Sequence, residues 1–169
     1  MAEEIVNRVA KSPLITFDLE ALYCEGERIA LDLSQWLDQG FILREKDFRN
    51  QLKNHDWSSY QDTFIALYCS TDAVVPAWAS MLVSTYLQPF TQKVVLGTLE
   101  QLEVQLFYEK IGEIDTSTYE NKPIIIKGCS NKPVPKDAYI QLISKLQPVA
   151  KSLFYGEACS SVPLFKQKK

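Results

Sequence analysis

One stretch of this chain occurs twice, and this repetition constrains the fold more than any other feature of the sequence. Residues Ile65–Gly97 and Ile125–Gly156 carry the same short motifs in the same order. The matching motifs are Cys69-Ser70 with Cys129-Ser130 at an offset of 60 and, after a one-residue gap, Val75-Pro76, Leu87-Gln88-Pro89 and Gly97 with Val134-Pro135, Leu146-Gln147-Pro148 and Gly156 at an offset of 59. Each copy predicts an apolar strand, a Cys-Ser turn, a helix entered through proline, and a return strand that ends at glycine.

The length and the charge of the chain limit its class. Its 169 residues fit a single domain, in which we expect a first part, residues 1–60, and the duplicated part, residues 61–160. The net charge of −3 leaves no basic face for nucleic acid. No signal peptide and no run long enough to span a membrane is present in the sequence, so we expect a cytoplasmic protein that binds no membrane. In that compartment its four cysteines are buried small residues, metal ligands or reactive thiols.

The first part of the chain predicts an N-terminal antiparallel meander. Residues 14–19 alternate apolar and polar side chains and predict a strand, residues 29–33 predict a second strand, and the turn Glu25-Gly26-Glu27 between them predicts a hairpin. Residues 40–43 predict a third short strand. After them, Phe48 and Leu52 lie one helical turn apart on a charged background, which predicts an amphipathic helix over residues 45–53.

The duplicated part alternates strands and helices. Its two Ile-rich runs have the continuous apolar character of strands covered on both faces, and each return strand should be parallel to the first strand of its copy. The predicted elements are strands 63–68 and 123–127, helices 76–90 and 135–151, and return strands 93–96 and 153–155. Thr98 and Gln101 resemble a capping box that opens a further helix. The predicted fold class is therefore α/β: a mixed sheet with the N-terminal meander and a duplicated β-turn-α-β unit, with helices packed on the sheet.

The three Cys-Ser turns carry the main functional hypothesis. If the strands are parallel, Cys69 and Cys129 both lie where a strand passes to a helix, at the sheet edge where sites gather in α/β proteins. Cys159 follows the second return strand and should reach the same edge. Soft thiolates select zinc or an iron–sulfur cluster, so these three cysteines are the predicted metal ligands. Asp72, three residues beyond Cys69, is the candidate fourth ligand, or it caps the helix that follows.

Two other interpretations of the cysteines stay open. The sequence has no C-x-x-C motif, so the Cys-Ser pairs can instead be structural turns of a metal-free interaction module. One cysteine can also be a reactive thiol of a sulfur-handling protein. A basic partner for it is lacking, because the one histidine, His55, precedes the strand that ends at Cys69 and is expected to pack beside Trp57. Cys24 lies outside the repeat and is expected to be incidental.

Catalytic signatures are missing from the sequence. It contains no G-x-G-x-x-G, P-loop, G-x-S-x-G or H-E-x-x-H motif. We therefore assign no catalytic or cofactor-binding residue and lean against an enzyme. The helix surface of Trp78, Met81, Leu82 and Tyr86 is expected to belong to the core, with a contact between two copies in a homodimer as the alternative.

Several segments of the chain resemble a known family. The segments N-H-D-W, Y-C-S-T-D-A-V-V-P-A-W-A and G-E-A-C-S-S-V-P-L-F-K, together with others from Glu3 to Lys166, are similar to a bacterial family catalogued as domain of unknown function 2480. The resemblance implies no defined activity, cofactor or catalytic residue. Genes of this family tend to lie near iron–sulfur assembly genes, so the resemblance implies a protein partner in that pathway and favours a thiolate metal-binding accessory protein over the two alternatives.

Overall fold

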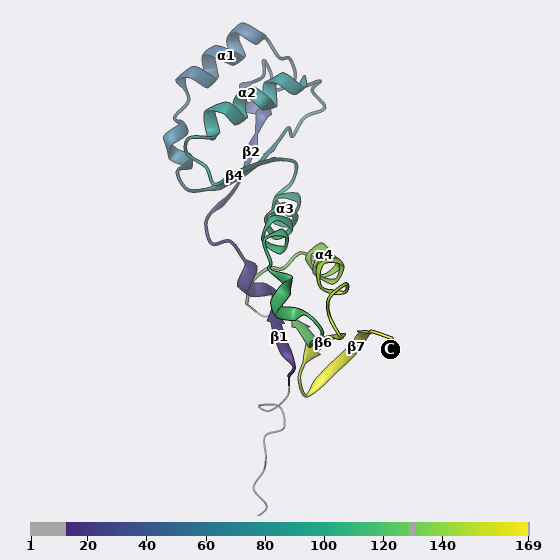
Figure 1. The fold of residues 1–169 in the computed structure, drawn as a ribbon. Helices are drawn as coiled ribbons and strands as arrows, with labels where there is room; N and C mark the ends of the chain where they lie inside the picture. Colours follow the sequence, from purple (N-terminus) through teal and green to yellow (C-terminus); the bar gives the residue numbers. More distant parts are fainter. Residues whose placement is uncertain (1–12, 129–130, 169) are drawn as a thin grey trace, which may run out of the picture. The chain divides into compact units, whose positions relative to one another are not determined.

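The computed structural model describes residues 13–128 and 131–168, and the chain divides into two compact units (Figure 1). The central unit is Cys24–Gln105, and the terminal unit combines Met1–Tyr23 with Leu106–Lys169. The second boundary falls inside one helix, α3, which spans Leu99–Gly112. Among the described residues, no helix combines the length and the apolar character needed to cross a bilayer.

The central unit is built on a three-stranded parallel sheet. Its strands β2 (Arg28–Asp32), β3 (Phe64–Tyr68) and β4 (Lys93–Leu96) lie in the order β2-β3-β4. Ile65 of β3 pairs with Ile29 of β2 and with Val94 of β4. The middle strand is buried from Phe64 to Leu67, as the continuous apolar run predicted.

Two helices of the central unit, α1 (Glu45–Asn54) and α2 (Ala77–Leu87), supply most of the helical contribution to its core. Phe48 and Leu52 are the fully buried stripe of α1, as their spacing predicted. The indole Nε1 of Trp57 donates a hydrogen bond of 2.7 Å to the Leu52 carbonyl, which closes the buried C-terminus of α1. The core also contains Leu31, Leu33, Trp36, Leu37, Ile65, Leu67, Ala79, Val83 and Leu87.

The terminal unit contains a four-stranded mixed sheet. Strands β1 (Ile15–Asp18), β5 (Pro123–Lys127), β6 (Ser152–Glu157) and β7 (Ser160–Lys166) lie in the order β1-β5-β6-β7. The first three are parallel, and β7 returns antiparallel to β6 with an irregularity between Leu153 and Phe154. Helix α4 (Lys136–Leu146) buries Ala138, Leu142 and Leu146 against Ile124, Ile126 and Leu153 of the sheet.

The same local motif begins each of four short 3-10 helices. These are η1 (Leu19–Leu22), η2 (Leu33–Trp36), η3 (Trp57–Tyr60) and η4 (Thr116–Tyr119). Each begins directly after an aspartate whose carboxylate accepts the backbone N–H two residues further on, and these aspartates are Asp18, Asp32, Asp56 and Asp115. This side-chain bond replaces the partner that the first N–H groups of a helix lack.

Corresponding elements of the two units are equally spaced along the chain. Strands β3 and β5 begin at residues 64 and 123, helices α2 and α4 at 77 and 136, and strands β4 and β6 at 93 and 152, in each case 59 positions apart. The spacing has no gap, so by number Cys129 corresponds to Ser70 and Cys69 to Gly128. The strands and helices on both sides of this turn are 59 positions apart, whereas the expected match of Cys69 with Cys129 has an offset of 60; Cys129 itself lies outside the described residues.

The expected N-terminal meander is wrong. Strands β1 and β2 lie in different sheets, and each pairs in parallel with a later strand, β5 or β3. Asp18 and Asp32 turn the chain into η1 and η2 at the ends of these strands, which prevents a tight hairpin there. The expected strand at 40–43 forms only an isolated bridge between Asp38 and Ile42.

Most of the remaining elements are confirmed. The fold is α/β, with helices packed on sheets, one of which is mixed. Both return strands are parallel to the first strand of their copy. Helices α2 and α4 end before Pro89 and Pro148. Thr98 and Gln101 form a reciprocal capping box at α3, with N–H to side-chain distances of 2.8 and 3.2 Å.

Candidate functional site

Cys69 follows β3 in the central unit and belongs to a turn held by local hydrogen bonds. Its Sγ lies 3.5 Å from the Thr71 hydroxyl oxygen, and the Thr71 hydroxyl donates to the Gly40 carbonyl at 2.6 Å. The thiol is partly buried. The turn after β3 is therefore fastened to the turn around Gly40, 31 residues earlier in the chain.

Ser70 is fastened to Asp32 at the end of the neighbouring strand. The Asp32 carboxylate accepts the Ser70 N–H at 3.0 Å, the Ser34 N–H at 2.9 Å and the Ser34 hydroxyl at 2.7 Å. The Ser34 and Ser70 hydroxyl oxygens lie 3.1 Å apart. Desolvation raises the pKa of Asp32, but the hydrogen bonds from Ser70 and Ser34 outweigh it and lower the pKa to about 2. This Cys-Ser turn thus has a structural role in joining β2 and β3.

The other predicted metal ligands are placed as follows. Cys159 lies in the turn between β6 and β7 of the terminal unit and is exposed. Cys129 lies outside the described residues. Asp72 is exposed and does not cap α2, whose N-cap residue is Pro76. Within residues 13–128 and 131–168, no group of three His, Cys, Asp or Glu side chains could hold a metal ion. A zinc or iron–sulfur site stays a prediction.

His55 has the role that the sequence indicated. The His55 ring lies 4.6 Å from that of Trp57, centroid to centroid, and its Nε2 is 3.0 Å from the Tyr60 hydroxyl oxygen. Packing of His55 beside Trp57 is confirmed. Cys24 is partly buried in the segment before β2.

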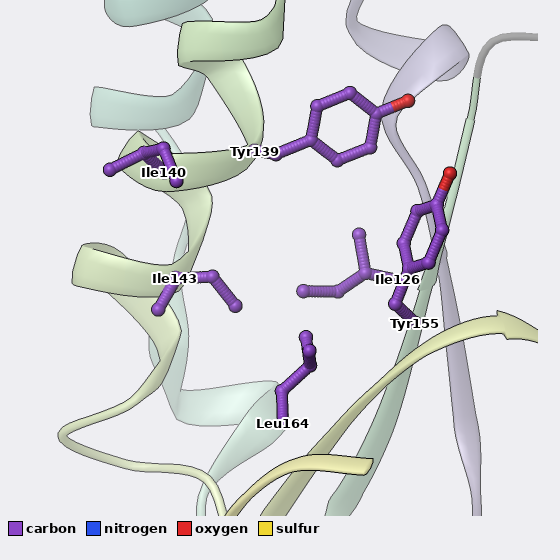
Figure 2. A pocket seen from close by; sticks show the side chains of 6 residues that line it. All are labelled: Ile126, Tyr139, Ile140, Ile143, Tyr155 and Leu164. Carbon is purple, nitrogen blue, oxygen red and sulfur yellow. The ribbon is translucent and has the colours of Figure 1, made fainter. Parts of the chain in front are cut away.

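An apolar pocket lies between α4 and the sheet of the terminal unit (Figure 2). Its volume is about 370 Å³, within the usual range of small-ligand sites. The lining residues are Ile126 from β5, Tyr139, Ile140 and Ile143 from α4, Tyr155 from β6 and Leu164 from β7. No charged side chain is among them.

Three of the lining side chains reach solvent although they are large and apolar. Ile140 is 66% exposed, Leu164 51% and Tyr155 43%. Ile126 is buried and forms the floor. Leu164 stands where the pairing of β6 and β7 is irregular, because Leu153 pairs with Phe165 whereas Phe154 pairs with Pro163. Leu164 is thus the extra, unpaired residue of β7, and the irregularity turns its side chain into the lining of the pocket.

The pocket has two chemically different ends. The rings of Tyr139 and Tyr155 meet edge to face with centroids 5.9 Å apart, and both hydroxyl groups lie at the same end of the pocket (Figure 2). Ile143 and Leu164 line the other end and are wholly aliphatic. The tyrosine end is the end at which α4 begins, since Tyr139 belongs to its first turns.

The central unit has a groove at the corresponding place, with different chemistry. It is lined by Leu67, Ser80, Met81, Ser84, Thr85, Gln88, Val94 and Leu96 and has a volume of about 510 Å³. Position by position at the spacing of 59, Ser80 corresponds to Tyr139, Met81 to Ile140 and Ser84 to Ile143. The two serines of the central groove thus correspond to a tyrosine and an isoleucine in the terminal pocket.

Sequence reasoning missed this pocket, although a signal for it exists in α4. The core requires one apolar stripe there, and Ala138, Leu142 and Leu146 supply it. Ile140 and Ile143 lie outside that stripe. The expected core surface of α2 is confirmed for Trp78, Leu82 and Tyr86, which pack on the core, but Met81 is exposed.

Comparison with known proteins identifies a family and no closer relative. The sequence profile of a family described as "Protein of unknown function (DUF2480)" matches residues 3–167. No curated protein matches the chain, and neither does any solved structure.

Proposed function

The chain belongs to this family of unknown function, and we propose that it is a binding module without a metal centre, whose recognition site is the apolar pocket of the terminal unit. Its ligand is an apolar group, free or carried on a partner protein, that enters this pocket. The observation that carries the proposal is the exposure of Ile140, Leu164 and Tyr155 around one concave, uncharged surface. Exposed apolar side chains that gather in a hollow are typical of binding sites, whereas isolated ones are common on any surface.

The equal spacing of corresponding elements supports the interpretation that the two units arose by an internal duplication. If so, the terminal copy has an apolar pocket where the central copy has serine side chains. Both helices bury a stripe of three residues in their cores, so the difference lies in residues beside that stripe. Of these, Ile140 is exposed, and Tyr139 and Ile143 pack against the core only in part. A difference of this kind is expected where one copy has acquired a binding role.

The structural role of the Cys69-Ser70 turn also supports an interaction module. Asp32 and Gly40 account for the polar groups of Ser70 and Thr71, so this turn needs no metal to hold it. The alternative of a thiolate metal site has no comparable supporting geometry among the described residues.

Binding of 1-anilinonaphthalene-8-sulfonate, a dye that fluoresces in apolar sites, tests the proposal. Ile140→Glu should weaken dye binding at least fivefold, because a carboxylate would enter the pocket. Met81→Glu is the matched control, since Met81 occupies the corresponding position of α2 and is 67% exposed against 66% for Ile140. Far-ultraviolet circular dichroism should show that both variants fold.

The proposal predicts that only Ile140→Glu lowers the affinity for the dye. Equal affinity in the wild type and in both variants would refute it, because the pocket would then not be the principal apolar site. Equal loss in both variants would refute it as well, since exposed apolar residues at large would then bind the dye.

A further inference from the structure

We propose that the apolar group bound in this pocket is an aliphatic acyl chain of about ten carbons, with its carbonyl oxygen at the tyrosine end. This inference rests on the proposed function and names the chemistry of the ligand. Its basis is the division of one pocket into an aliphatic end and a hydroxyl end.

The size of the pocket suits a chain better than a single side chain. A protein cavity of about 150 Å³ holds one benzene molecule, with six carbons. By the same scale, 370 Å³ has room for roughly fifteen carbons if wholly filled, and about ten if the open side stays hydrated. A leucine side chain supplies only four carbons and would leave most of the volume to water.

The lining of the pocket suits an unbranched aliphatic chain. Ile126 forms a buried floor, and Ile143 and Leu164 line the end away from the hydroxyl groups. No polar side chain at that end could hydrogen-bond to a polar ligand group, so such a group would lose its water without compensation. A methylene chain has no such group to satisfy.

The tyrosine end supplies a hydrogen-bond donor for a carbonyl oxygen. The Tyr155 hydroxyl has no hydrogen-bond partner among the described residues, and it lies at the mouth beside the Tyr139 ring. Two charged residues flank this end along their own elements: Lys136, one turn before Ile140 on α4, and Glu157, two residues after Tyr155 on β6. Because one positive and one negative side chain flank the tyrosine end, this end can accept a carbonyl oxygen of a charged free acid or of an uncharged ester or amide on a partner.

Displacement of 1-anilinonaphthalene-8-sulfonate by sodium hexanoate, octanoate and decanoate, and by their methyl esters, tests the inference. Each added methylene should strengthen binding about fourfold, from about 0.8 kcal/mol per buried methylene. Ile140→Glu should abolish this dependence on chain length, and Met81→Glu should leave it unchanged. Tyr155→Phe, which keeps the ring and removes the hydroxyl, should weaken every acid and ester by a similar factor of about three to ten.

The acids and the esters separate the two sources of the chain. Preference for the carboxylates would support the inference with a free fatty acid as ligand, and equal affinity for the esters would support it with an acyl group attached to a partner. Independence of chain length would overturn it. If N-acetyl-leucyl-leucinamide displaces the dye and decanoate does not, the acyl chain is overturned and the pocket still stands as a recognition site for protein side chains.

Discussion

Replacing Asp32 with alanine should lower the free energy of unfolding of the central unit by about 2 kcal/mol. The carboxylate accepts three hydrogen bonds, at 2.7 to 3.0 Å, and one of them comes from Ser70 in the turn after the neighbouring strand β3. Hydrogen bonds to a charged acceptor contribute about 1.5–3 kcal/mol each when buried, and partial exposure reduces this. The pKa gives a second measure: a fall from 3.8 to about 2 corresponds to at most ~2.4 kcal/mol before screening by solvent is allowed for.

Asp56→Ala is the matched control for this prediction. Asp56 also caps a 3-10 helix of the central unit, accepting the Ser58 N–H at 3.1 Å and the Ser58 hydroxyl at 2.5 Å. It makes no bond to another strand in these contacts, so its loss should cost only about 0.5–1 kcal/mol. Urea unfolding followed by tryptophan fluorescence measures both variants, because the three tryptophans, Trp36, Trp57 and Trp78, all belong to the central unit.

The pH dependence of stability gives a sharper test of the same carboxylate. Because the folded-state pKa of Asp32 lies below the unfolded value, its contribution is fully present above about pH 5 and is lost as the pH falls towards 2. About half of it should be lost by pH 3. In Asp32→Asn this component is missing, so the loss of stability between pH 6 and pH 3 should be smaller than in the wild type. An equal loss in both proteins would refute the assignment of the low pKa to Asp32.

Two further predictions concern a core residue of the central unit and the start of α3. Phe48→Ala should lower the free energy of unfolding by about 3–5 kcal/mol, because the ring is fully buried against Trp36 and Trp78. Urea unfolding followed by tryptophan fluorescence measures this change. A loss below about 1 kcal/mol would show that the site collapses around the smaller residue. Thr98→Ala should lower the free energy of unfolding by about 1 kcal/mol, because it removes one half of the capping box of α3. Thr98→Ser is the control that keeps the hydroxyl, and differential scanning calorimetry measures both variants. Equal melting temperatures for the alanine and serine variants would contradict the role of that hydrogen bond.

The elements that the sequence predicted correctly are those whose signals are local. Phe48 and Leu52 mark the buried side of α1 by spacing alone, and Thr98 with Gln101 marks the start of α3 by side-chain chemistry. The apolar runs of β3 and β5 predicted strands in the middle of their sheets, because burial on both faces leaves no room for alternation. None of these inferences requires knowledge of which distant segment is the neighbour.

The partners of β1 and β2 could not be predicted in this way. Their sequences indicate strands, but an antiparallel hairpin and two separate parallel pairings suit these sequences equally. The choice is made by contacts more than 30 residues away, such as those of Asp32 with Ser70 and of Glu20 with the Asn131 N–H. Strand β7 is not among the elements predicted from the sequence, and it contains Pro163, which is tolerated because β7 lies at the edge of its sheet.

The pocket becomes readable in the sequence once the two units are aligned at the correct spacing. At 59 positions, Ala79, Val83 and Leu87 of α2 correspond to Ala138, Leu142 and Leu146 of α4, and all six are fully buried. The core is thus conserved in kind between the two helices, so it cannot explain why Ser80 and Ser84 correspond to Tyr139 and Ile143. Ile140 and Tyr155 are exposed beside this core, and exposed apolar side chains add a cost in solubility. Their retention around one hollow, where β7 adds Leu164, is best explained by a ligand that covers them.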